Sequence, residues 1–354
     1  MFAFLFYLPF LLVFVLFAVY AERKVSAFMQ DRLGPMVVGK YGILQTLADV
    51  LKMLQKEDIV NNSADRLLFV VAPIVIFVSV FTGFAVLPVA PDIMGAPIET
   101  GVFFLLGVVS LDVIGILMAG WGSNSKFSLF GAMRSVAQIV SYEIPLGLSV
   151  LCVIMLTETL NLQEISYHQG IFNNGEVMSN LGWASYGGIL SWNIIRFPFL
   201  IVLFVLFFIS SLAESNRTPF DLPESESELI GGFHTEYSGF RWAIIMLAEY
   251  GMMLLVSLLA VVLFLGSWNT PFPNIAGLQF AEWTSREPGT IASNLWGIFW
   301  LLTKTMVLIF VQMWVRWTYP RIRVDQVMTL SWKYLTPIGL VMILITGIWK
   351  LWLG

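Results

Sequence analysis

Long apolar runs alternate with short polar connections along the whole chain. Runs long enough for the ~20 residues of a bilayer crossing lie at 2–20, 67–89, 101–120, 136–157, 188–213, 243–266, 294–317 and 334–353. We therefore predict an all-α integral membrane protein with about eight transmembrane helices. The chain contains no internal repeat and no linker rich in Pro, Gly and Ser, so we expect residues 1–354 to form a single transmembrane domain.

The first apolar run has no Lys or Arg before it and is followed directly by Glu22, Arg23 and Lys24. A secretory signal has the opposite order of charge, so we predict that this run is a retained first helix. A different pattern follows, in which apolar residues recur at helical spacing: Ile43, Leu44, Leu47, Val50, Leu51 and Leu54. This spacing predicts an amphipathic helix that lies in the membrane interface or against a partner.

The positions of Lys and Arg predict the orientation, because cytoplasmic connections carry the excess of positive charge. Of the 19 basic residues, 15 lie in four loops, at 21–66, 121–135, 214–242 and 316–333. The other three loops, at 88–100, 158–187 and 267–293, together hold one. We therefore place the four basic loops on the inner side and both termini on the outer, periplasmic side.

The composition excludes several classes of function. With 58% hydrophobic and 12% charged residues and a mean hydropathy of +0.82, the chain is not a water-soluble protein. Two histidines and one cysteine cannot supply an iron–sulfur cluster, so we expect no metal site and no redox centre on this chain. A basic tract for nucleic acid, a glycine-rich phosphate loop and a recognisable nucleophile–histidine pattern are all absent from the sequence. We therefore expect no catalytic residues of its own.

Four ionisable residues interrupt the apolar runs: Asp112, Glu143, Glu249 and Lys304. Inserting such a group at a helix centre costs at least ~2.5 kcal/mol, so each must face protein or water. The three acids lie at similar depths, roughly 10–13 Å from the inner ends of their spans at 1.5 Å per residue. Two interpretations stay open. Either the acids pass protons among themselves, or each is a satisfied hydrogen-bond partner between helices.

The third inner loop is unusually acidic for the side on which positive charge is expected. It holds six acids within 23 residues: Glu214, Asp221, Glu224, Glu226, Glu228 and Glu236. Such a run is ordinarily a solvated surface. Here apolar residues interrupt it and it follows directly on a membrane helix. We therefore favour a structured loop that conducts protons or contacts a basic partner.

Read together, the inner loops form a specific set of strings. They are ERK at 22–24, QDRLGPMVVGKYGILQTLADVLKMLQKE at 30–57, GWGSNSKFSLFGAMRSVAQIVSYE at 120–143, AESNRTPFDLPESESELIGGFHTEYSGF at 213–240 and YPRIRVDQVMTLSWK at 319–333. In this order, and over essentially the whole chain, they resemble the H subunit of the proton-pumping NADH-quinone oxidoreductase, the NADH dehydrogenase subunit 1 family of respiratory complex I.

The resemblance implies a membrane subunit at the heel of an L-shaped assembly. Its inner loops would face the peripheral arm and wall a narrow chamber for the quinone headgroup. The residues that match quinone-binding positions are Arg23, Arg32, Ala48, Asp49, Phe220 and Arg316. A carboxylate among arginines suits a headgroup with two carbonyl oxygens, because guanidinium groups donate hydrogen bonds to such oxygens.

The resemblance also implies a proton path that begins at the chamber. Its residues would be Glu143, Glu214, Asp221, Glu224, Glu226 and Glu249, with Asp112 and Lys304 as weaker matches. Quinone would be the substrate, and FMN and iron–sulfur clusters would belong to partner subunits. The implied partners are the quinone-site subunits of the peripheral arm, neighbouring small membrane subunits and lipids, in a multi-pass protein of the bacterial inner (plasma) membrane.

Three other functions remain as alternatives. An energy-converting hydrogenase has a related membrane subunit, but the completeness of the strings around ADVLK and YPRIRVDQ favours the quinone enzyme. A secondary proton or cation transporter usually shows two repeated halves, which this chain lacks. A passive membrane anchor would tolerate neutralisation of its buried acids. The outer loops at 158–187 and 267–293 are longer than the resemblance leads us to expect, and we assign them no role.

Overall fold

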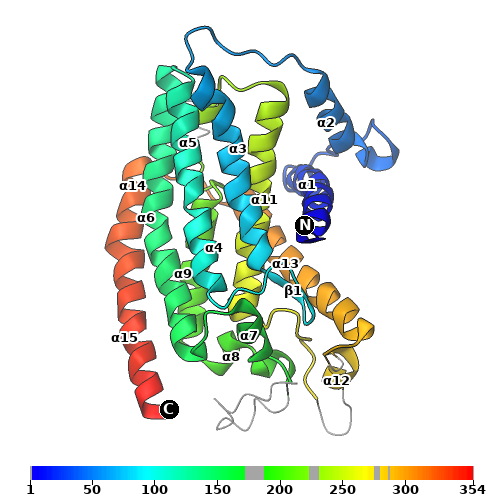
Figure 1. The fold of residues 1–354 in the computed structure, drawn as a ribbon, viewed down its shortest axis with the longest axis vertical. Helices are drawn as coiled ribbons and strands as arrows, with labels where there is room; N and C mark the ends of the chain where they lie inside the picture. The colour runs from blue at the N-terminus through cyan, green and yellow to red at the C-terminus, as the bar shows by residue number, and fades with distance from the viewer. Residues whose placement is uncertain (1, 172–186, 223–230, 275–279, 286–287, 354) are drawn as a thin grey trace.

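Apolar helices packed side by side make up most of the molecule (Figure 1). The computed structural model describes residues 2–171, 187–222, 231–274, 280–285 and 288–353. The helices of the first half are α1 (Phe2–Met29), η1 (Lys40–Gly42), α2 (Gln45–Gln55), α3 (Arg66–Gly83), η2 (Phe84–Val86), α4 (Gly101–Val109), α5 (Leu111–Gly122), α6 (Lys126–Thr157) and α7 (Leu162–Tyr167). Those of the second half are η5 (Gly188–Ser191), α8 (Asn193–Arg196), α9 (Leu200–Glu214), η6 (Gly232–His234), α11 (Gly239–Phe264), α12 (Phe280–Ser285), α13 (Ile291–Thr318), α14 (Val324–Thr329), the π-helical η7 (Leu330–Leu335) and α15 (Thr336–Leu353).

Six helical segments within the described residues are long and apolar enough to cross a membrane. They are Arg66–Val86, Gly101–Gly122, Lys126–Thr157, Gly239–Phe264, Ile291–Thr318 and Val324–Trp352. Each overlaps one of the predicted spans, which confirms an all-α protein with the helices of a membrane protein. The predicted first span lies within α1. The count of eight spans and the side of the termini remain predictions.

The fifth predicted span, 188–213, is not one continuous helix. The short helices η5 and α8 come first, and α9 begins only at Leu200, after Pro198. Proline has no N–H to donate and its ring clashes with the preceding turn, which explains the break at this point. The 15 residues of α9 extend about 22 Å at 1.5 Å per residue, less than a full bilayer crossing.

Helix α11 forms the centre of the bundle. Every residue from 251 to 264 is buried, and α3, α9, α13 and α1 all contact this helix. Small residues let other helices approach closely: a Cβ on Gly115 of α5 would lie 2.6 Å from Ile76 of α3. Close approach at small residues is the usual way in which membrane helices gain packing contacts. Glu249 lies on α11 two residues before this fully buried stretch.

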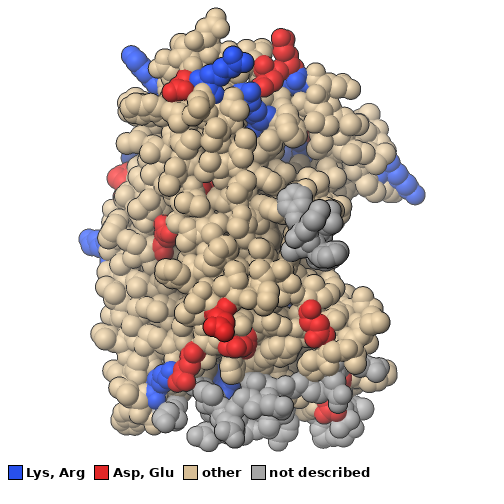
Figure 2. All heavy atoms as spheres, in the orientation of Figure 1, with Lys and Arg blue, Asp and Glu red and all other residues tan. Residues whose placement is uncertain are grey.

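The two ends of the molecule differ. At the end that the charge pattern assigns to the outer side, the strands β1 (Pro88–Ala90) and β2 (Ile93–Met94) form a small antiparallel hairpin near α7 and α12 (Figure 1). Figure 2 shows most of the Lys and Arg on the visible face in the upper half, whereas Asp and Glu predominate at the lower end. This distribution agrees with the charge asymmetry of the loops.

The predicted amphipathic helix is confirmed as α2. It contacts α1 and α11 and buries Thr46, while Leu47, Leu51 and Leu54 are about half exposed. Figure 1 shows it at one edge, connected to α3 by an extended segment. Its place in the membrane interface remains a prediction.

Candidate functional site

Three carboxylic acids from three helices line one pocket inside the bundle. Asp112 of α5, Glu214 of α9 and Glu249 of α11 surround an empty volume of about 440 Å³, which includes the mouth of the pocket. Asp112 is 7% exposed and Glu214 is 5% exposed. Among the described residues, none donates a hydrogen bond to Oδ1 of Asp112 or to Oε2 of Glu214. Buried carboxyl oxygens without a donor are costly, and this favours a role in proton exchange over simple packing.

Glu143, which we expected at the same depth, does not line this pocket. It is half-buried on α6. It lies within electrostatic range of Glu214, as Asp112 does. The expected group of three acids is therefore replaced by Asp112, Glu214 and Glu249, with Glu143 beside them.

A buried arginine connects this pocket to the inner end of α1. Arg217 is 5% exposed. Its Nε lies 3.3 Å from Oε1 of Glu249, and its Nη1 lies 3.3 Å from Oε2 of Glu22. The guanidinium carbon is also 4.2 Å from the ring centroid of Tyr250, in a cation–π contact. Arg217 therefore bridges two carboxylates on different helices.

Glu22, at the inner end of α1, makes two further polar contacts. The hydroxyl of Tyr250 donates to its Oε2 at 2.7 Å, and Nη1 of Arg316 forms a short ion pair with its Oε1. Burial of a carboxylate is tolerated only when cations and donors compensate the lost hydration, and Glu22 has both. We missed Glu22, Arg217 and Tyr250 as site residues. Glu22 and Arg217 are charged residues at the ends of spans, where charge is common, and Tyr250 is one of many aromatic residues of the chain. Only the packing of α1 against α11 and α13 brings them together.

Arg23, the residue after Glu22 on α1, pairs with helix α2 rather than with the buried cluster. Nη1 of Arg23 forms an ion pair of 2.5 Å with Oδ2 of Asp49 on α2, and Nε2 of Gln45 donates to Oδ1 of Asp49 at 3.2 Å. Ala48 precedes Asp49 on the same helix. Consecutive residues Glu22 and Arg23 therefore connect the buried ion pairs to the exposed pair between α1 and α2.

The remaining predicted quinone residues are more dispersed. Arg32 is exposed just after the end of α1. Phe220 is buried, and its ring centroid lies 5.2 Å from that of Tyr142 on α6. The structure thus groups Arg23, Ala48 and Asp49, connects Arg316 to them through α1, and leaves Arg32 and Phe220 outside the group.

The acidic loop is described only at its two ends. Glu224 and Glu226 lie outside the described residues. Asp221 is half-buried, and its backbone carbonyl accepts a short hydrogen bond from Arg321. Lys304 lies apart from all these acids, where it donates to backbone carbonyls beyond the outer end of α11.

The inner part of α6 positions both described ends of that loop. Nε2 of Gln138 donates to the carbonyl of Ala213 at 2.7 Å, and Oγ of Ser128 donates to the carbonyl of Phe233 at 2.8 Å. This explains why α6 begins at Lys126, ten residues before the predicted span: one face of its first turns, which includes Ser128 and Gly131, packs against the loop. Phe233 also lines the pocket of the three acids.

His234 follows Phe233 in the chain and extends the polar region around the pocket. Burial lowers its pKa, whereas the nearby charges of Glu249 and Asp221 act in the opposite direction. Its ring packs edge-on against Phe233 and Trp242. The burial effect is the larger one, so His234 is neutral near pH 7.

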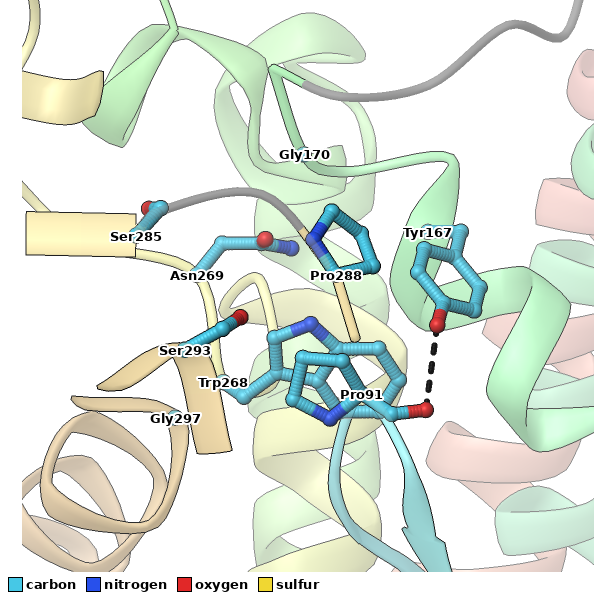
Figure 3. A pocket seen from close by; sticks show the side chains of 9 residues that line it. All are labelled: Pro91, Tyr167, Gly170, Trp268, Asn269, Ser285, Pro288, Ser293 and Gly297. Carbon is cyan, nitrogen blue, oxygen red and sulfur yellow. Dashed lines mark hydrogen bonds between the residues drawn. The ribbon is translucent and has the colours of Figure 1, made fainter. Parts of the chain in front are cut away.

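A second pocket lies at the outer end and contains none of the predicted site residues. In Figure 3, Tyr167 and Trp268 face the hairpin residue Pro91, and the hydroxyl of Tyr167 donates to the carbonyl of Pro91 at 3.0 Å. No Asp, Glu, Lys or Arg is among the described residues that line this pocket.

Comparisons with known proteins agree with the resemblance seen in the inner loops. The NADH dehydrogenase family model matches residues 2–347. The chain is 56% identical to one of the H subunits of NADH-quinone oxidoreductase, that numbered 2, of Cytophaga hutchinsonii, with both chains covered completely. It is 52% identical to the H subunit of Chlorobaculum parvum, over 94% of this chain and 87% of the relative. It is 44% identical to the H subunit of Bacteroides fragilis, over 92% of this chain and 84% of the relative.

Proposed function

This chain belongs to the NADH dehydrogenase family, alongside the H subunits of NADH-quinone oxidoreductase, and we propose that it walls the quinone chamber and begins the proton path of that enzyme. In this proposal the protein is a multi-pass subunit of a bacterial inner membrane. Its inner loops dock on the quinone-site subunits of the peripheral arm, and small membrane subunits and lipids cover its sides. Electrons reach the quinone from FMN and iron–sulfur clusters in partner subunits.

The observation that best supports this proposal is the series of ion pairs that leads from Asp49 to the buried acids. Asp49 pairs with Arg23, the adjacent Glu22 pairs with Arg217 and Arg316, and Arg217 pairs with Glu249 in the pocket. Guanidinium groups near the chamber suit the carbonyl oxygens of a quinone headgroup. Quinone reduction alters the charge near Asp49 and Arg23. Because neighbouring ion pairs interact electrostatically, this change also alters the electrostatic potential at Arg217 and at the acids of the pocket.

The pocket then supplies the groups that take up and release protons. Asp112, Glu214 and Glu249 line it together, so each can exchange protons with the others and with water that enters the pocket. Because like charges in one pocket oppose each other, a shift in charge at Arg217 changes how many of them hold protons. Glu143 lies beside Glu214 and takes the proton onward toward neighbouring membrane subunits.

The Asp49→Asn variant in native membranes tests the quinone assignment. The rate of NADH oxidation with a quinone should fall by tenfold or more, since a charge-assisted contact contributes about 1.5–3 kcal/mol. The rate with an artificial acceptor that takes electrons upstream of the quinone should not change. Asp58→Asn is the matched control, because Asp58 lies in the same inner loop and pairs with Arg241 away from α1. Equal quinone-dependent rates for Asp49→Asn and wild type would contradict the assignment.

The Glu249→Gln variant tests the proton path. It keeps the size of the side chain but removes the charge that pairs with Arg217. In closed membrane vesicles, the number of protons moved per NADH oxidised should fall. A variant that oxidises NADH and pumps with the wild-type ratio would exclude Glu249 from the path and favour a passive anchoring role.

A further inference from the structure

A proline interrupts the hydrogen bonds of α6 close to Glu143. The helix continues from Lys126 to Thr157 with Pro145 inside it, two residues after Glu143. Because proline has no N–H, the carbonyl of Ser141, four residues before Pro145, loses its usual donor within the helix. Ser141 is buried, and a buried carbonyl without a donor is costly. The turn that carries Glu143 therefore needs a donor from outside α6.

Ser331 of η7 supplies this donor. Its Oγ donates to the carbonyl of Ser141 at 2.5 Å, and Ser331 is fully buried. The next residue, Trp332, donates from Nε1 to Oγ of Ser141 at 3.3 Å. Two consecutive residues of η7 thus bind the carbonyl and the hydroxyl of the same serine.

The segment around Ser331 is bound to α6 by a further contact. The hydroxyl of Tyr142 donates to the carbonyl of Val327 on α14 at 2.9 Å. Figure 1 shows α14 and α15 beside α6, and both helices contact it. Between them η7 is a π-helical turn, in which the N–H of Thr336 donates to the carbonyl of Ser331. Such turns are rare and are frequent at functional sites. The segment from α14 to η7 therefore holds the two residues that directly precede Glu143.

A second proline turn has the same kind of partner. Pro73 lies inside α3, so the carbonyl of Phe69 also loses its donor within the helix. The hydroxyl of Tyr237, in the third inner loop, donates to this carbonyl at 3.2 Å. Hydroxyl groups of two different inner segments thus replace the donors that Pro73 and Pro145 lack. The contact of Ser331 is therefore a specific replacement of a missing hydrogen bond.

The contact with η7 lies on the side of α6 away from the carboxylate. At 3.6 residues per turn, Ser141 and Glu143 are about 200° apart around the helix axis. Glu143 lies within electrostatic range of Glu214. A donor behind the turn can therefore fix the direction of Glu143 without contacting its carboxylate.

We propose that Ser331 is a positioning residue for Glu143. By donating to the carbonyl that Pro145 leaves free, it holds the turn of α6 that presents Glu143 to Glu214. This inference rests on the proposed proton path, in which Glu143 takes the proton onward from Glu214. Ser331 itself carries no proton and acts only through the geometry of the turn.

The test measures the initial rate of NADH-driven proton pumping in closed, inverted membrane vesicles. Each rate is divided by the rate of NADH oxidation with an upstream artificial acceptor, which reports the amount of assembled complex. Ser331→Ala removes the donor. Ser149→Ala is the matched control, because Oγ of Ser149 is also buried against α6 and donates to the carbonyl of Leu146 at 2.6 Å. That carbonyl keeps a donor within the helix, the N–H of Val150.

The decisive variant combines Ser331→Ala with Pro145→Ala, which gives residue 145 an N–H. Ser331→Ala alone should lower the normalised pumping rate on the order of tenfold, since it leaves a buried carbonyl without a donor. The double variant should return to within about twofold of wild type, because residue 145 then donates to Ser141 within the helix. Ser149→Ala should pump as wild type does.

Two results would overturn the inference. One is a double variant that pumps no better than Ser331→Ala, because the free carbonyl would then not be what Ser331 serves. The other is failure of Ser331→Ala to assemble, because the hydroxyl would then be needed for folding rather than for placing one carboxylate.

A second comparison tests whether Ser331 acts through Glu143. If it does, Ser331→Ala combined with Glu143→Gln should pump no more slowly than Glu143→Gln alone, since residues that act as a unit are not additive. A clearly slower double variant would overturn the inference. Wild-type pumping by Glu143→Gln would instead contradict the proposed path, and it is measured without any change at Ser331.

Discussion

The carboxylate of Glu22 compensates two guanidinium groups at once. Arg217 and Arg316 both pair with it, and Arg217 is almost completely buried. Removing one member of a buried ionic group leaves the other charges without compensation and costs about 3–5 kcal/mol. The same charge holds Arg217 between α1 and α11, so both assembly and coupling depend on it.

We predict that Glu22→Gln lowers the temperature at which the complex loses quinone-dependent activity and also lowers the quinone-dependent rate at low temperature. Glu57→Gln serves as the control, because Glu57 is an exposed acid of the same inner loop. Heating membranes in steps and assaying the remaining activity separates the two effects. Identical inactivation curves for Glu22→Gln and wild type would show that the cluster contributes nothing to stability.

His234 gives a pH-dependent prediction. Its pKa is lowered by burial in the folded protein, against the raising effect of Glu249 and Asp221. The unfolded chain therefore binds this proton more readily, so the stability contribution is complete above about pH 6.5 and is lost as the pH falls through the folded pKa. Between pH 7.5 and 5.5, the midpoint of thermal inactivation should fall further for wild type than for His234→Gln. An equal fall in both proteins would contradict the prediction.

Sequence reasoning found the acids that stand alone in apolar runs and Glu214 in the acidic loop, and it missed Glu22 and Arg217 at the ends of spans. Asp112 and Glu249 were predicted because an ionisable group amid apolar residues requires a partner. Glu22 and Arg217 occur where charges are common, so their burial could not be inferred without the packing of α1 and α9 against α11. A charged residue can be recognised in the sequence, but the residues that pair with it depend on the tertiary structure.

Helix α6 and the end of the acidic loop touch through two glycines. A Cβ on Gly131 would lie 2.8 Å from backbone atoms of Gly232 and Phe233. Such a contact with backbone requires the loop to move, and overpacking of this kind typically costs about 1–3 kcal/mol. Phe233 lines the acid pocket, so the displacement reaches the site.

We therefore predict that Gly131→Ala decreases quinone-dependent activity and proton pumping, although the substitution changes no charged group. Gly147→Ala on the same helix is a matched control, since no atom lies within 4 Å of its added Cβ. Alanine also favours a helix over glycine by up to about 1 kcal/mol, so the control should be neutral or slightly stabilising. Wild-type pumping by an assembled Gly131→Ala complex would show that the loop adapts without cost to the site.

At the level of elements, hydrophobic runs predicted where the spans lie better than where helices begin and end. The runs at 67–89 and 243–266 correspond closely to α3 and α11. Helix α6 starts earlier because one face of its first turns, with Ser128 and Gly131 buried, packs against the loop, and α9 starts later because Pro198 interrupts the helix. Packing of one helix face against a neighbouring loop leaves no hydrophobic signal, so the start of α6 could not be predicted, whereas Pro198 was visible in the sequence.

The orientation of the whole molecule connects the charge pattern to the proposed mechanism. The acid pocket opens among the residues of the third basic loop and the inner half of α11, whereas Lys304 lies toward the opposite end. If the four basic loops are inside, the ion pairs face the peripheral arm and the lysine faces the periplasm. The opposite orientation would place the lysine between the acids and the cytoplasm and would leave the pocket without access to the arm.

Cysteine labelling tests this orientation directly. Cys152 is the single cysteine of the chain and is buried, so Cys152→Ser provides a background for one new cysteine at a time. Asn62 and Glu99 are both exposed, the first in an inner loop and the second in an outer loop. In intact cells, a membrane-impermeant thiol reagent should label Glu99→Cys and spare Asn62→Cys. In inverted vesicles stripped of the peripheral arm the pattern should reverse, because the positive-inside distribution of Lys and Arg fixes the first loop on the cytoplasmic side. Labelling of Asn62→Cys in intact cells would overturn the orientation and, with it, the placement of the quinone chamber.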